Sequence, residues 1–193
     1  MVEHVVLPSA ADLAGDVASR AVATLAAAQA DGGRAALALT AGSIMEQVWT
    51  ALAASDSGID WSRVDVFWGD ERFVPSDSAD RNDLPAEKLL FSTAPFSAAT
   101  RYSMPASGGE YDEDLDAAAA GYARTLAEHG ASGIELVLLG IGPDGHCCSL
   151  FPDHPSATDL SAPVIAVRDS PKPPPLRLSL SFDGLNAARE IWV

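Results

Sequence analysis

Cysteine is scarce in this sequence. The 193 residues include 2 cysteines, the neighbours Cys147 and Cys148, and no other cysteine is available as a partner. Adjacent cysteines rarely reach disulfide geometry with each other, so we expect both thiols to be reduced. Reduced thiols agree with a cytoplasmic protein, because disulfides persist mainly in oxidising compartments.

Long hydrophobic runs are also missing. Although 48% of the residues are hydrophobic, no apolar run approaches the about 18 residues that a membrane-spanning helix needs. The N-terminal segment is acidic and has only a very short apolar run, unlike a secretory signal peptide. We therefore expect a globular, cytoplasmic protein that does not bind a membrane.

Positive charge is in short supply. The chain has 12 lysines and arginines against 27 acidic residues, a formal net charge of −15. An acidic surface repels polyanions, which argues against a nucleic-acid partner. A small anionic ligand remains compatible with this charge if a few basic side chains gather at one site.

Strand and helix patterns alternate along the chain. Short apolar runs predict strands over residues 35–40, 64–69, 134–140, 163–168 and 177–182, with another beginning at 191. Helical periodicity predicts helices over 11–30, 44–54, 84–91 and 112–129, and the polar segment 70–83 is expected to be mostly loop. Such alternation is typical of an α/β fold with a mainly parallel, Rossmann-like open sheet and helices on both faces.

The length fits one domain, residues 1–193. A chain of this size buries roughly 70% of its unfolded surface, enough for a hydrophobic core without staples. We find no internal repeat and no change of composition that would mark a second domain. Because the last residues, "IWV", look like the start of a strand, we expect the C-terminal part of the domain to be missing.

The stretch "LLGIGPDGHCCSLFP" contains a G-x-G-x-x-G at Gly140, Gly142 and Gly145. That spacing binds a dinucleotide only where a helix follows the glycines, and here Pro152 stops any helix after about two turns. The turn instead presents His146 at the carboxyl end of a buried strand, where open α/β sheets bind ligands. Imidazole is well suited to proton transfer near neutral pH, although a histidine bonded to a neighbouring carbonyl is the plain alternative.

Three other strand-end segments carry polar groups. "LTAGS" leads into a helix whose N-terminal amides attract anions. "GDER" places Asp70 and Arg72 after the next strand, and "SPKPPPLR" places Lys172 and Arg177 on a proline-rich scaffold. Taken singly, these are equally a capped turn or a spacer with incidental charges. Together with His146 they are suited to bind a phosphate and act on a group beside it.

The order and spacing of these segments resemble the 6-phosphogluconolactonase branch of the superfamily that also contains glucosamine-6-phosphate isomerase/deaminase. The matching motifs are "LTAGS", "FWGDERFVP", "LLGIGPDGHCCSLFP" and "DSPKPPPLRLSL". The resemblance implies hydrolysis of 6-phospho-D-glucono-1,5-lactone to 6-phosphogluconate, the second step of the oxidative pentose phosphate pathway, with no metal or organic cofactor. It also implies that related chains continue beyond Val193.

The resemblance assigns roles to particular residues. His146 matches the general base that activates water, with Asp70 and Arg72 as further catalytic candidates. The expected substrate- and phosphate-binding residues are Gly42, Ser43, Arg72, Asn82, Gly142, Gly145, Lys172 and Arg177. Backbone amides near the two glycines of the histidine loop, or Arg72, are candidate donors to the oxyanion that forms during hydrolysis.

Several alternatives remain open. The isomerase/deaminase branch shares the glycine turn and histidine, but its motif typically continues into "AFNEP", whereas this sequence reads "SLFP". A sugar-phosphate-binding protein without catalysis is a second alternative. A metal site at His146, Cys147, Cys148 and His154 is disfavoured, because neighbouring cysteines rarely turn toward one ion. We expect a monomer.

Overall fold

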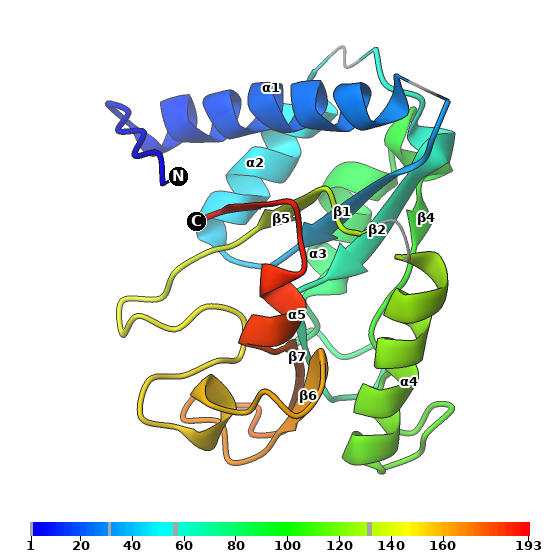
Figure 1. Cartoon of the computed structure of the whole chain (residues 1–193), viewed down its shortest axis with the longest axis vertical. Coiled ribbons are helices and arrows are strands. Elements are labelled where there is room, and N and C mark those ends of the chain that lie inside the picture. The colour runs from blue at the N-terminus through cyan, green and yellow to red at the C-terminus, as the bar shows by residue number, and fades with distance from the viewer. Residues whose placement is uncertain (1, 31, 56–57, 131–132) are drawn as a thin grey trace.

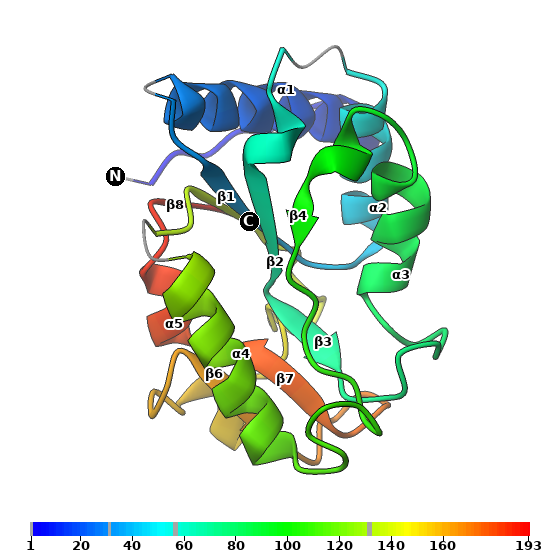
Figure 2. The same ribbon diagram turned by 90° about the vertical axis from the view of Figure 1, so that its right-hand side faces the viewer.

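The computed structural model describes residues 2–30, 32–55, 58–130 and 133–193, and its strands form two sheets (Figures 1 and 2). One sheet has five parallel strands in the order β4-β2-β1-β5-β8, and the other has three antiparallel strands in the order β3-β7-β6. The strands are β1 (Ala35–Leu39), β2 (Val64–Trp68), β3 (Asp70–Arg72), β4 (Thr100–Arg101), β5 (Leu136–Leu138), β6 (Val164–Val167), β7 (Arg177–Leu180) and β8 (Glu190–Trp192).

The mainly parallel central sheet confirms the predicted α/β class. Its two-residue edge strand β4 was not predicted, and two further points need correction. The predicted strands β6 and β7 do not join that sheet; they pair antiparallel with each other, and β7 also pairs with β3. The second correction concerns β3, which lies within the segment expected to be loop. β3 forms because the chain continues almost directly from β2 and finds a partner in β7 (Figure 2).

The helices are α1 (Ala10–Gln29), α2 (Ser43–Ala53), α3 (Asp83–Ala86), α4 (Leu115–His129) and α5 (Phe182–Asn186). Short 3-10 turns occur at Trp61–Arg63, Phe96–Ala98 and Pro155–Ala157, and a π-helical turn at Glu87–Phe91 follows α3. α4 begins three residues later than predicted, because Asp114 takes the N-cap position and accepts the N–H of Ala117. None of the helices among the described residues is long and apolar enough to cross a membrane.

Helices cover both faces of the parallel sheet. Neighbouring residues of a strand point to opposite faces, and on β2 the side chains of Phe67 and Trp68 pack against different aromatic groups. Trp68 meets Trp49 of α2 edge-on, with ring centroids 6.4 Å apart. Phe67 stacks on Tyr102 at 4.9 Å, and Tyr102 stacks on His129 at the end of α4. α2 and α4 therefore lie on opposite sides of β2, as predicted.

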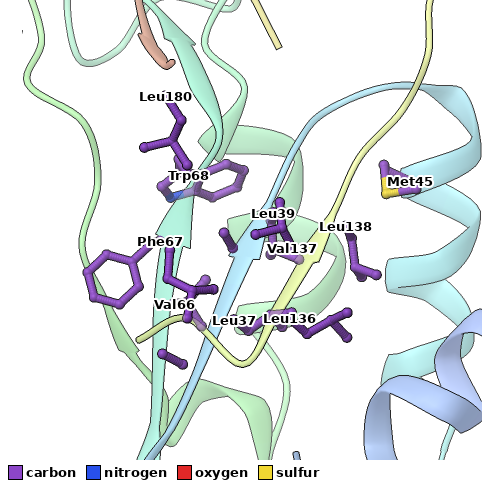
Figure 3. Packing of buried hydrophobic residues seen from close by; sticks show 14 of the residues in the cluster. Leu37, Leu39, Met45, Val66, Phe67, Trp68, Leu136, Val137, Leu138 and Leu180 are labelled. Atoms are coloured by element: carbon purple, nitrogen blue, oxygen red, sulfur yellow. The ribbon is translucent and has the colours of Figure 1, made fainter. Parts of the chain in front are cut away.

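The hydrophobic core surrounds the three central strands, as Figure 3 shows for side chains of β1, β2 and β5. Every residue of β1, β2 and β5 is buried, which is typical of parallel strands covered on both faces. Among them are Leu37, Leu39, Val66 and Leu136. Each such side chain stabilises the fold by about 1.5–3 kcal/mol relative to an exposed one.

Gly69 lies where the carboxyl ends of two central strands meet the histidine loop. Its N–H donates to Leu39 O at 2.8 Å. A Cβ here would come within 2.7 Å of Thr40 Cγ2 and 2.9 Å of Cys148 Sγ. Because glycine has no Cβ, the chain after β2 can pack closely against the end of β1 and the segment that follows β5. The loops that carry the candidate site residues start from this junction.

Candidate functional site

The His146 ring lies in the loop after β5, between an acid and an aromatic ring. Its Nδ1 is 2.5 Å from Asp144 Oδ1, and the ring stacks on Phe151 with centroids 4.8 Å apart. A Cβ at Gly142 would overlap the imidazole, so only glycine at this position leaves room for the ring. The His146 side chain is 21% exposed and therefore accessible to a ligand.

Asp144 determines the tautomer of His146. The bond from His146, followed by the bond from Lys172, holds the pKa of the Asp144 carboxyl well below its usual range. An ionised carboxylate only accepts, so Nδ1 must carry the proton and the lone pair of the neutral ring belongs to Nε2. Asp144 was not predicted as a site residue; its position two residues before the histidine, in "PDGH", was the available signal.

Lys172 reaches the same carboxylate from the proline-rich segment between β6 and β7. Its Nζ lies 3.0 Å from Asp144 Oδ2 and 3.1 Å from His146 Nδ1. Both nitrogens are donors, so they share Asp144 and do not bond to each other. The Lys172 side chain is 42% exposed. The structure thus brings two of the predicted residues, 26 positions apart, into direct contact.

Arg177, in contrast, is buried beneath that segment. Its Nε donates to Pro174 O at 3.1 Å, and its Nη2 donates to Lys172 O at 2.9 Å and Pro173 O at 3.1 Å. Burial lowers the pKa of Arg177, and the neighbouring charge of Arg72 lowers it further. Because Nε and Nη2 face backbone carbonyls, Arg177 holds the Lys172 segment in place; the expected direct contact with a phosphate stays a prediction.

Asp70 is a buried acid below the site. Ser149 Oγ donates to Asp70 Oδ2 at 2.7 Å, and Asn82 Nδ2 lies 3.1 Å from Asp70 O and 3.4 Å from its Oδ1. Burial raises the pKa of Asp70, while the Ser149 bond and the positive charge of Arg177, 4.0 Å away, oppose that rise. Asp70 and Asn82 are therefore brought together, with both side chains turned inward.

Arg72 presents a donor that the protein does not use. Its Nη1 donates to Asp80 O at 2.7 Å, which fixes the guanidinium. Its Nε is buried and has no hydrogen-bond partner among the described residues. An unsatisfied buried donor costs about 1–3 kcal/mol. Arg72 therefore keeps one donor, shielded from solvent, that no described residue uses.

Gly42 and Ser43 form the turn between β1 and α2. Gly42 has φ 137° and takes the N-cap position without a side-chain cap. The first amides of an α-helix attract anions. Gly140 N donates to Thr40 Oγ1 at 3.2 Å, which ties this turn to the start of the histidine loop. Both turns therefore share the carboxyl edge of the parallel sheet.

The N–H groups of Gly142 and Gly145 are used within the histidine loop, while the expected role of neighbouring amides stays a prediction. Gly142 N donates to His146 O, and Gly145 N donates to Gly142 O, both at 2.8 Å. These bonds close the turn, so the two amides are not available to an oxyanion. Residues 146–154 contain no helix, which agrees with the rejection of a dinucleotide site.

Cys147 and Cys148 are free thiols, as predicted. Burial raises the pKa of both, so they remain protonated near neutral pH. Among the residues that the structure describes, no three His, Cys, Asp or Glu side chains are grouped to hold a metal ion. The thiols next to His146 are packing groups.

The fold and site define an α/β protein with a histidine, two acids and basic side chains at the carboxyl edge of a parallel sheet. A family model described as glucosamine-6-phosphate isomerases/6-phosphogluconolactonase matches residues 8–193. The chain belongs to this family.

Its relatives carry the name of one branch. A 6-phosphogluconolactonase of Streptomyces coelicolor is 42% identical over 185 residues, which cover 91% of this chain and 71% of the relative. A 6-phosphogluconolactonase of Mycobacterium tuberculosis is 38% identical over 193 residues, which cover 97% of this chain and 78% of the relative. A crystal structure of a 6-phosphogluconolactonase from Shewanella baltica superposes with a TM-score of 0.81 at 26% identity, covering 99% of this chain and 81% of the other.

Proposed function

We propose that this protein hydrolyses 6-phospho-D-glucono-1,5-lactone to 6-phosphogluconate in the oxidative pentose phosphate pathway. The observation that carries the proposal is the Asp144–His146 pair, 2.5 Å apart, at the edge where Lys172 and Arg72 also lie. The family and the names of its relatives support the substrate. No metal or organic cofactor takes part in the proposed reaction.

His146 acts as general base through Nε2. It accepts a proton from water as the water oxygen forms a bond to the lactone carbonyl carbon, and the carbonyl oxygen becomes an oxyanion. Asp144 holds the ring and stabilises the imidazolium that forms. The oxyanion then re-forms the carbonyl, the bond to the ring oxygen breaks, and that oxygen takes the proton from His146.

Lys172 and Arg72 are the proposed oxyanion donors, in place of the glycine amides. Lys172 Nζ is next to the imidazole and half-exposed, and Arg72 Nε has no hydrogen-bond partner within the described part of the chain. Removing one donor of this kind typically raises the barrier by about 2.7–4 kcal/mol.

The proposed phosphate contacts are the first amides of α2, at Gly42 and Ser43. This turn is exposed and tied to the histidine loop, and its N-terminal amides favour an anion. Arg177 then contributes indirectly, by holding the segment that carries Lys172. Asp70, bonded to Asn82, balances the charge of the arginines beneath the substrate.

Parallel incubation with two substrates tests this function. We expect lactone hydrolysis well above the spontaneous rate, and no ammonia release from glucosamine-6-phosphate. Ammonia release would place the protein in the isomerase/deaminase branch. Binding of 6-phosphogluconate with no acceleration of lactone hydrolysis would favour a sugar-phosphate-binding protein.

A further inference from the structure

Glu71 lies directly behind the site, and the mechanism above does not use it. Its side chain is fully buried. Its carboxylate accepts three backbone N–H groups, from Arg72 at 2.8 Å, Asn82 at 2.6 Å and Asp83 at 3.0 Å. One side chain therefore satisfies amides that are up to 11 positions apart in the sequence.

These amides belong to the two ends of one loop. The chain leaves β3 after Arg72 and returns at Asn82, where α3 begins. The loop in turn holds two site side chains, since Arg72 Nη1 bonds to Asp80 O and Asn82 Nδ2 bonds to Asp70 O. The positions of the Arg72 guanidinium and the Asn82 amide thus depend on a loop that Glu71 closes.

Arg81 holds the carboxylate from the loop side. Its Nη2 is 3.6 Å from Glu71 Oε2, and it forms a two-pronged pair with Asp83 at 2.8 and 2.9 Å. The charged and titratable groups around Glu71 are Arg81, Asp83, Arg177 and Tyr122. A buried arginine is strongly destabilising without its partners, so this cluster is suited to one fixed geometry.

We propose that Glu71 is a positioning residue for the reaction: its carboxylate fixes the 73–82 loop and so places Arg72 and Asn82, and protonation of that carboxylate loosens them. This inference rests on the proposed function. A protonated carboxyl has lost its charge and carries an O–H donor in place of one acceptor lone pair, so it holds the three amides and Arg81 more weakly than the carboxylate does.

The electrostatics make this proton exchange accessible near neutral pH. Burial raises the pKa of Glu71 to about 7, against the opposing charge of Arg81. The 73–82 loop is therefore ordered above neutral pH, where Glu71 is ionised, and loosened below it, where Glu71 is protonated.

Glu71→Gln tests the proposal, because glutamine has the shape of the protonated acid and cannot ionise. Affinity for 6-phosphogluconate is measured by calorimetry for both proteins at about pH 8 and about pH 6. We expect the variant to bind about tenfold more weakly at the higher pH, as for the loss of one charged hydrogen bond, and nearly equally at the lower pH. Ionisation of the ligand is common to both proteins and cancels when their affinities are compared at one pH. If the ratio of the two dissociation constants, variant to unmodified protein, is the same at both pH values, the proposal is overturned.

Glu135→Gln is the matched control. Glu135 is also buried and also accepts a backbone N–H, from Ala36 at 2.5 Å, but it directly precedes β5, at the amino edge of the parallel sheet and away from the site. We expect Glu135→Gln to bind 6-phosphogluconate as tightly as the unmodified protein at both pH values. A pH-dependent ratio in this variant would mean that any buried carboxylate has the same effect, and would overturn the assignment to Glu71.

Amide hydrogen exchange tests the same proposal without a ligand. In Glu71→Gln we expect about tenfold faster exchange at Asn82 and Asp83, relative to unchanged amides in β1, at about pH 8. If the unmodified protein does not bind 6-phosphogluconate at all, the proposed function fails while this measurement still decides on Glu71. Unchanged exchange at both amides overturns the positioning role.

Discussion

At the scale of single residues, the Asp144 carboxylate decides which nitrogen of His146 can accept a proton. It is 2.5 Å from Nδ1 and is also held by Lys172. An ionised acid at Nδ1 leaves Nε2 as the basic nitrogen and stabilises the imidazolium once the proton has moved. In the proposed reaction the catalytic unit is therefore a pair of side chains, although only the histidine stands out in the sequence.

Asp144→Asn is expected to lower kcat for the lactone by about 10²-fold or more, with a small change in KM. The amide is uncharged, so it neither stabilises the imidazolium nor fixes the proton at Nδ1. Steady-state kinetics measure both constants. Asp153→Asn, an exposed acid in the same loop, is the control and should leave both unchanged. A normal kcat in Asp144→Asn would contradict the role of the pair.

At the scale of elements, Gly69 sets how closely the strand ends approach. Gly69→Ala is expected to destabilise the protein by about 1–3 kcal/mol, because its Cβ would meet Thr40 and Cys148 inside normal contact distance. Gly15→Ala, within α1 and with open space around its Cβ, should instead stabilise by about 0.5–1 kcal/mol. Urea unfolding measures both changes; two changes of the same sign would contradict this packing.

The sequence pattern predicted the parallel strands well, because β1, β2 and β5 are apolar runs buried on both faces. It missed β3, whose residues Asp-Glu-Arg have no strand propensity and pair only because β7 lies opposite. The alternating "RLSL" of β7 is typical of antiparallel sheets and was the available signal for a second sheet. The five-residue α5 is too short to show a helical period.

The candidate site was predictable only in part. Strand-end placement and the resemblance pointed to His146 and Lys172, and the structure puts them in contact. Sequence does not reveal which donors turn inward. Arg177 and the glycine amides were therefore expected to face the ligand, although they bond within the protein. Glu71 acts through backbone amides, which leave no pattern in the sequence.

At the scale of the whole molecule, Glu71 links global stability to pH. Burial raises its pKa from 4.5 to about 7. Between these values the folded state keeps a proton that the unfolded chain has lost, so the contribution of Glu71 to stability falls as pH rises through this window. Its ionised form, which the site needs, is the less stable one.

Glu71→Gln is therefore expected to gain stability relative to the unmodified protein as pH rises from about 5 to about 8, by up to about 3 kcal/mol. Urea unfolding at several pH values gives this difference. The exposed Glu110→Gln is the control and should follow the unmodified protein. If the free energies of unfolding of Glu71→Gln and the unmodified protein change with pH by the same amount, the raised pKa of Glu71 is contradicted.

The single domain over residues 1–193, the monomer, the cytoplasmic location and the lack of a nucleic-acid partner stay predictions. The relatives quoted above are longer than this chain, which covers 71–81% of their length. Residues 8–193, which match the family model, include the parallel sheet, the turn after β1 and the loop that carries His146.

The most direct test of the account is the turnover of 6-phospho-D-glucono-1,5-lactone by His146→Ala, measured together with its affinity for 6-phosphogluconate. With the general base removed, we expect kcat to fall about 10²- to 10⁴-fold while the affinity for the product changes little. His4→Ala, in the exposed N-terminal segment, should retain full turnover. Near-normal turnover in His146→Ala would contradict the central claim that this imidazole activates the water.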